Sequence, residues 1–524
     1  MYIEPNTTIK IYHNVPLDNS YDDTLYFDSV SYQNAYFHSG LEPLKYTLSR
    51  QSYQRVMKGR MRIAIKSDDL YDCNYLAFQN TNFGNKWFYA FITGVEYVNN
   101  ETSEVTFEID VMQTYMFDTS LKACFVEREH TTSDNFGEHI LDEGLDVGEY
   151  VMSDYGEIAD NQSLPLRDTV IVVSYSEKNG STSHGTLVDG VFSGTKRVVY
   201  NANNAGVQAL STFLDGYMDT PENIVSIYMA PKMCFPYATD SGADVPYGTS
   251  GSSRLGIEIN PLNLSADFGG YVPRNKKLYC YPYNFVHVDN ANGNSLSLRY
   301  EFFNDFEPHL NVEGNASEPI QIVCRPSGYK GTKSADGGLQ GWESLNTESI
   351  SLQSYPQCSW RTDSFTSWLA QNSIPIAINT FTQGAISGFT GNPLPLLNQG
   401  VSVLTQGYNA SIATDVIRGS HQTGNVNFSR SMQTFYSGRC HITRDYAEAI
   451  DNFFTRYGYA CRRIKVPNRN ARTNWTYTKT EHCKVIGGAP ADDLKKIGSI
   501  YDHGITFWNS PSNVGNYNLS NDPH

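Results

Sequence analysis

A chain of 524 residues with 36 Tyr, 26 Phe, 41 Gly and 22 Pro can bury about two to four hydrophobic cores. This composition favours a β-rich, turn-rich fold over a helical bundle. The formal net charge of −16 argues against a general nucleic-acid binder, because Lys and Arg supply affinity for phosphate.

The nine cysteines are widely spaced and form no C-x-x-C pair. We therefore expect free thiols in a protein assembled in a reducing cytoplasm, rather than a disulfide framework. The N-terminus lacks a basic region followed by an apolar run, so we expect no signal peptide. No window of about 20 residues is apolar enough to predict a permanent membrane span.

The N-terminal part alternates apolar and polar residues, as strands do. Thr8–Tyr12 predicts a strand, and Lys86–Val98 with Glu104–Phe117 predicts a long hairpin around the turn Asn99–Ser103. Cys124–His130 predicts a further strand. We assign residues 1–164 to the first part of one domain.

The middle of the chain, residues 165–360, predicts a separate β-rich domain. Thr169–Tyr175 is typical of a buried strand, and a helix is expected within Asn201–Met218. A strand pair is predicted at Leu278–Val288 and Ser295–Phe303.

The C-terminal part, residues 425–524, contains the best-defined helix. Thr443 can cap a helix over Arg444–Tyr457, and Gly458 can end it. Strands are predicted around it, at Phe435–Ile442, Tyr459–Val466, Trp475–Ile486 and Ile500–Trp508.

Between the last two parts lies an uncharged stretch, Ser364–Thr414, without Asp, Glu, Lys or Arg. Apolar residues recur in it at spacings of three and four, and Gly391–Pro393 forms a turn, so we predict a hairpin of two weak helices. Its large apolar residues are Ile374, Ile376, Ile378, Phe381, Ile386, Phe389, Leu394, Leu396, Leu397, Val401, Val403, Leu404 and Ile412.

Two interpretations of this stretch remain open from the residues. It is either a hairpin that stays buried in the protein or at an interface, or a metastable segment that later leaves its place. The stretch is too polar for a permanent span, but its lack of charge removes the largest cost of entering lipid, about 2.5–3.5 kcal/mol per central charge.

A cluster of basic residues stands out in this acidic chain, because no Asp or Glu interrupts it. It consists of Arg456, Arg462, Arg463, Lys465, Arg469, Arg472 and Lys479. A solvated loop face is the simplest interpretation. The alternative is an assembly patch, formed by Arg462, Arg463, Lys465, Arg469 and Arg472, which contacts an acidic partner protein or another subunit. DNA contact is the less favoured alternative, because the chain as a whole is acidic.

The sequence gives only weak evidence for a metal site or a catalytic site. Glu127 and Glu129 share one face of a strand while His130 points away, and the neighbours in Cys440-His441 and His482-Cys483 likewise face opposite ways. The sequence contains no G-x-S-x-G, H-E-x-x-H or P-loop motif. We expect a protein without cofactor or metal that is not an enzyme.

Several segments from both ends of the chain resemble one known family in their amino-acid sequence and in their order along the chain. It is the tail knob, or distal tail tube, protein of small short-tailed phages of the φ29 type (Salasmaviridae and Rountreeviridae). The matching segments are Phe78–Phe91, Phe107–Asp118, Val126–His130, Asp142–Leu145, Phe453–Pro467, Tyr501–Trp508 and Gly515–Tyr517. Residues 150–360 match poorly, which suggests an inserted domain.

The resemblance implies a β-rich α+β protein whose two ends build a tail-tube-like antiparallel β-barrel or sandwich domain. Six copies would form a ring at the distal end of the virion tail, in contact with other tail and collar proteins. Double-stranded DNA would pass through the ring without tight binding. The apolar loop 364–414 would plug the lumen and would be released to breach the host membrane during genome ejection.

A second function is also compatible with the aromatic, β-rich composition. Exposed Trp and Tyr with paired carboxylates would suit a tail protein that binds or depolymerises cell-surface polysaccharide. The mass of the particle in solution separates the two possibilities, because the tube requires six copies.

Overall fold

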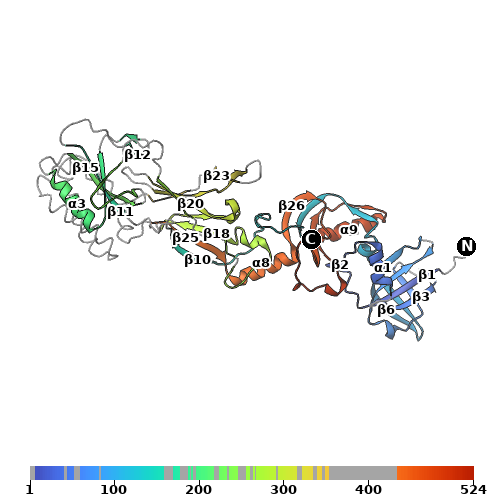
Figure 1. Cartoon of the computed structure of the whole chain (residues 1–524). Coiled ribbons are helices and arrows are strands. Elements are labelled where there is room, and N and C mark those ends of the chain that lie inside the picture. The colour runs from blue at the N-terminus through green and yellow to red at the C-terminus, as the bar shows by residue number, and fades with distance from the viewer. Residues whose placement is uncertain are drawn as a thin grey trace, which may run out of the picture. The chain divides into compact units, whose positions relative to one another are not determined.

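The computed structural model in Figure 1 describes residues 6–39, 44–51, 59–81, 84–158, 169–177, 187–188, 191–192, 196–217, 223–232, 235–245, 255–259, 264–265, 267–290, 293–314, 322–333, 339–344, 349–352 and 434–524. Strands dominate these residues, as the composition predicts, and nearly all pair antiparallel, as the resemblance implies. The chain forms two compact units. Unit 1 comprises Met1–Asp146, Gly269–Leu278 and Arg444–His524, and unit 2 comprises Val147–Phe268 and Tyr279–Thr443.

Unit 1 contains a six-stranded antiparallel sheet from the N-terminal segment. Its order is β3 (Leu44–Gln51), β1 (Thr7–His13), β5 (Cys73–Gln79), β6 (Trp87–Asn99), β7 (Thr102–Ile109) and β4 (Arg60–Ile63). The predicted hairpin is present as β6 and β7. Its second strand ends at Ile109 rather than Phe117, because Asp110 accepts hydrogen bonds from the amides of Met112 and Gln113 and caps the short helix α2 (Val111–Thr114).

A second sheet of unit 1 joins both ends of the chain. Its order is β2 (Asp23–Leu25), β29 (Ile505–Trp508), β27 (Trp475–Glu481), β9 (Cys124–Glu129) and β26 (Tyr459–Lys465). Only the β2–β29 pair is parallel. Because β9 lies between β27 and β26, the N-terminal segment is built into the middle of a C-terminal sheet.

The remaining elements of unit 1 are short strands and helices. They are β8 (Thr119–Leu121) paired with β28 (Val485–Gly487), and α1 (Val30–His38), α8 (Arg444–Tyr457) and α9 (Ala491–His503). Helix α8 has the predicted bounds, and Gly458 follows it at φ 64°. The strand predicted at Ile500–Trp508 is wrong in its first half, because α9 continues to His503 and Gly504, at φ 105°, precedes β29.

Unit 2 contains three four-stranded sheets. The first has the order β10 (Tyr150–Glu157), β25 (Tyr436–Ile442), β18 (Asn284–Asp289) and β19 (Ser295–Leu298). The second is β15 (Ile224–Pro231), β11 (Thr169–Tyr175), β14 (Lys196–Asn201) and β16 (Ala243–Asp244), with helix α3 (Asn204–Asp215) against β14. The third is β17 (Leu255–Ile259), β20 (His309–Gly314), β21 (Ile322–Ser327) and β24 (Ile350–Leu352).

The described part of unit 2 also contains two small hairpins, namely β12 (Leu187–Val188) with β13 (Val191–Phe192), and β22 (Gly331–Lys333) with β23 (Leu339–Ser344). The predicted strand Leu278–Val288 is shorter than expected. A 3-10 turn occupies Lys276–Tyr279, and β18 begins only at Asn284.

The units divide the chain at positions other than those predicted from composition. β10 and β25, which we placed in the two terminal parts, lie side by side in unit 2. Conversely, the short segment Gly269–Leu278 belongs to unit 1, although residues on both sides of it belong to unit 2. These divisions depend on pairings between distant residues, which no local pattern encodes.

Candidate functional site

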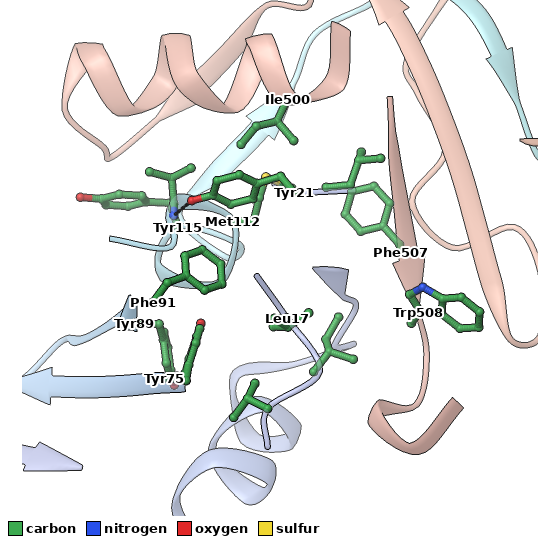
Figure 2. Close-up of a cluster of buried hydrophobic side chains, with 14 of the residues drawn as sticks. Leu17, Tyr21, Tyr75, Tyr89, Phe91, Met112, Tyr115, Ile500, Phe507 and Trp508 are labelled. Carbon is green, nitrogen blue, oxygen red and sulfur yellow. Dashed lines mark hydrogen bonds between the residues drawn. The ribbon is translucent and has the colours of Figure 1, made fainter. Parts of the chain in front are cut away.

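The buried core of unit 1 is where the N- and C-terminal segments meet. Figure 2 shows Tyr21 between Phe91 of the N-terminal sheet and Ile500 of α9, with Phe507 and Trp508 beside them. The rings of Tyr21 and Phe91 pack edge to face at 5.5 Å. Burying a large aromatic side chain contributes about 1.5–3 kcal/mol, so the two segments stabilise each other and fold as one unit.

Hydrogen bonds align the same junction. The indole nitrogen of Trp508 donates to a carboxylate oxygen of Asp23 at 2.6 Å, and the amide of Tyr26 donates to the carbonyl oxygen of Trp508 at 2.8 Å. The N-terminal sheet also buries its second face, where alternate residues such as Leu76 and Phe78 form a separate cluster. This sheet is therefore covered on both sides.

Asp451 on α8 attaches the short segment Gly269–Leu278 to unit 1. Its fully buried carboxylate accepts hydrogen bonds from the Tyr271 hydroxyl at 2.6 Å and from the amides of Arg274 and Asn275 at 3.0 Å. The side-chain amide of Asn275 donates to it as well, at 2.8 Å. Four donors around one buried carboxylate hold the segment in a single position.

Glu143 also attaches the segment Gly269–Leu278 to the rest of unit 1, because it pairs with Lys277 of that segment. Its carboxylate, 1% exposed, forms ion pairs with Arg128 and with Lys277, whose side chain is also buried. It further accepts a hydrogen bond from the amide of Ala460 at 3.1 Å. A buried carboxylate is tolerated there only because two cations compensate for its lost hydration.

The basic cluster is divided by the fold. Arg472 is buried, Lys465 pairs with the buried Glu129, and Arg469 lies half-buried beside Tyr501. Only Arg462 and Arg463 of the predicted assembly patch are exposed, on the edge strand β26. Outside that patch, Lys479 pairs with Glu127 at 2.7 Å, and Arg456 lies 5.0 Å from the ring of Tyr517.

The candidate metal ligands have other partners. His130 is buried; one ring nitrogen accepts from the Tyr477 amide at 2.8 Å, and the other lies 3.2 Å from the Thr455 carbonyl oxygen. Burial, with the nearby charge of Arg472, lowers the pKa of His130 to about 3. Cys440 and His441 lie on β25 in unit 2, whereas His482 and Cys483 follow β27 in unit 1. Within the described ranges, no three His, Cys, Asp or Glu side chains gather as a metal site would require.

The predicted lumen plug, Ser364–Thr414, lies outside the described residues together with all of its apolar positions. The described strands that precede and follow it, β24 and β25, both belong to unit 2. Among the helices that the structure describes, none is long and apolar enough to cross a membrane.

Comparison with known proteins finds matches to the N-terminal segment and to the C-terminal half of the chain. Residues 252–522, more than half of the chain, match the family described as the C-terminal domain of the Bacillus phage phi29 tail knob protein gp9. Residues 5–120 match the N-terminus of the caudoviral major tail protein. The tail knob proteins gp9 of Bacillus phages PZA and phi29 are 25% and 24% identical, each over 98% of this chain and 98% of the relative.

A solved structure also shares the fold. The structure of the bacteriophage C1 tail knob protein, gp12, has a TM-score of 0.67 at 14% identity, and covers 99% of this chain and 100% of that chain. These relatives carry names of a structural tail component rather than of an enzyme. The chain belongs to the tail knob protein family of phi29-like phages.

Proposed function

We propose that this protein forms a hexameric tube or knob at the distal end of a phage tail, through which double-stranded DNA leaves the virion. The observation that carries this proposal is the junction in unit 1. There the N-terminal sheet, which matches major tail proteins, packs with the C-terminal segment, which matches tail knob proteins. The match to both families over the two segments of one packed unit supports a tube-building role.

The charge of the chain suits a DNA conduit. Six copies at −16 each would surround the DNA with a strongly negative wall. Such a wall repels the polyanion and prevents adhesion during ejection. Other tail proteins are the expected neighbours at the ends of the ring.

The uncharged stretch Ser364–Thr414 is proposed as the plug of the lumen and as the segment that enters the host membrane. The support is its sequence, which combines large apolar side chains with polar but uncharged ones. Such a segment can contact water in the lumen, and it can enter lipid without the free-energy cost of burying a charged side chain. Since the strands before and after it belong to unit 2, the plug would be held by that unit.

Multi-angle light scattering of the purified full-length chain tests the tube. The expected mass is six times 58.8 kDa, and negative-stain images should show rings. A trimer that cleaves or binds cell-wall polysaccharide would contradict the tube and support the alternative function.

A further inference from the structure

The second sheet of unit 1 ends in two strands, and exposed side chains of opposite charge lie on or beside them. In its order, β2 stands first and β26 last, with three strands between them. At about 4.8 Å per strand, the two edges lie roughly 19 Å apart. Figure 1 shows both strands in the part of the chain that contains α9.

The β26 edge, defined here as Cys461–Val466, is basic and apolar at once. Arg462 and Arg463 are exposed, and the large side chains of Ile464 and Val466 are 75% and 53% exposed. Arg463 donates to the sulfur of Cys461 at 3.2 Å, and Arg462 has no ion pair among the described side chains. Arginine beside exposed aliphatic residues is typical of a protein contact surface.

The backbone of this edge is irregular. Arg462 has φ 47°, and the pairing register with β9 shifts between Ala460 and Arg463. A bulge of this kind disturbs the row of free backbone groups that would otherwise accept an added strand. Side chains, rather than a continued sheet, therefore have to make the contact.

The β2 edge, defined here as Asp18–Asp28, is acidic in the residues that flank the strand. The strand itself is buried, because the side-chain amide of Gln113 donates to the carbonyl oxygen of Leu25 at 2.8 Å. Asp18, Asp22 and Asp28 are exposed, and Asp23 is partly buried. Burial raises the pKa of Asp23, and the charges of Asp22 and Asp18 raise it further, so these carboxylates lie close enough to repel one another.

Few cations relieve this repulsion. Lys496 pairs with Glu108 at 2.5 Å, and the ring nitrogen of His503 is 4.0 Å from Asp22. Helix α1 follows directly in the chain with two exposed apolar side chains, Val30 at 50% and Tyr32 at 66%. This edge thus complements the β26 edge in charge and also offers apolar surface.

The signs of the charges decide which edges can meet. Two β26 edges would bring four arginines together, and two β2 edges would bring together the aspartates of two copies, so both symmetric contacts are repulsive. Only the contact between unlike edges is attractive. A contact between two different surfaces is heterologous, and it generates a ring when the rotation closes.

We propose that, in the ring, the β26 edge of one copy docks against the β2 edge of the next, with Arg462 and Arg463 facing Asp18 and Asp22. This inference rests on the proposed function, because it assigns the contact that would join neighbouring copies of the ring. The partner is a second copy of this chain.

Reciprocal charge reversal in the full-length chain tests the contact. The variant Arg462→Glu/Arg463→Glu has two acidic edges, and the variant Asp18→Lys/Asp22→Lys has two basic edges, so each alone is expected to lose the ring peak in light scattering. Mixed in equal amounts, each converted edge meets its converted counterpart and each native edge its native counterpart. The mixture is therefore expected to recover rings of alternating copies, which close for an even number of subunits.

The control variant Arg50→Glu/Lys66→Glu reverses two exposed cations on β3 and just after β4, in the other sheet of unit 1, and should assemble like the unchanged chain. Circular dichroism of each variant verifies folding. Rings formed by either single-edge variant, or folded variants that stay apart when mixed, would overturn the contact while leaving the hexamer intact. An unchanged chain that remains monomeric would contradict the proposed ring and this contact together.

Discussion

The surroundings of Asp110 determine the pKa of its carboxyl group. Its carboxylate is buried, caps α2, and accepts a hydrogen bond from the Tyr75 hydroxyl at 2.8 Å. Burial raises the pKa of this group to about 6, although the hydrogen bonds from Tyr75 and from two backbone amides lower it. The cost of desolvation exceeds what three donors return.

The raised pKa gives a prediction with a definite sign. The folded protein binds the proton more tightly than the unfolded chain, so the stabilising contribution of Asp110 is complete below about pH 4 and is lost as pH rises through about 6. The variant Asp110→Asn keeps the capping oxygen without a charge, and it should flatten this part of the pH dependence. Urea unfolding between pH 4 and pH 7 measures the effect, and an unchanged slope would contradict it.

At the same position, Asp110→Ala is the contrasting variant. It removes the cap of α2 and leaves the Tyr75 hydroxyl without its acceptor. A loss of about 2–3 kcal/mol in the free energy of unfolding is expected at pH 4, and a smaller loss at pH 7, where the unchanged chain has already lost part of the contribution of Asp110. Together the two variants separate the charge of Asp110 from its hydrogen bonds.

At the scale of elements, the short segment Gly269–Leu278 depends on helix α8. Asp451→Ala removes the acceptor of the Arg274 and Asn275 amides and should cost about 3 kcal/mol. Hydrogen–deuterium exchange at these two amides should accelerate. Glu448→Ala on the same helix is the matched control, because its pair with Arg444 is solvent-exposed and contributes little. Equal exchange in both variants would show that Asp451 does not hold the segment.

Local patterns predicted some elements well and others poorly, for physical reasons. Helix α8 follows Thr443, a residue type that favours helix caps, carries a one-sided apolar stripe and is followed by Gly458, so the local signals agree. In contrast, Ile500 and Tyr501 are apolar residues a few positions before β29 and suggested a longer strand. They instead lie on the buried face of α9. This helix continues to His503, and Gly504 ends it.

At the scale of the whole molecule, the plug can be separated from the ring. A deletion of Ile374–Ile412 removes none of the strands and helices described for either unit, so rings should still assemble. Electron microscopy should then show an open channel, whereas the full-length chain should show a closed one. A closed lumen in the deletion variant would contradict the plug without affecting the ring.

The sequence by itself determined the β-rich class, the segments that match tail knob proteins, the uncharged stretch and most strand positions, because these depend on local composition and periodicity. The tertiary structure decided which residues can act at a surface. It buried Arg472, paired Lys465 with Glu129 and left Arg462 and Arg463 exposed at one edge of a sheet. It also placed the aspartates of β2 at the opposite edge. That arrangement arises because β9 pairs with strands more than 300 residues away, and such pairings follow from the packing of the whole unit.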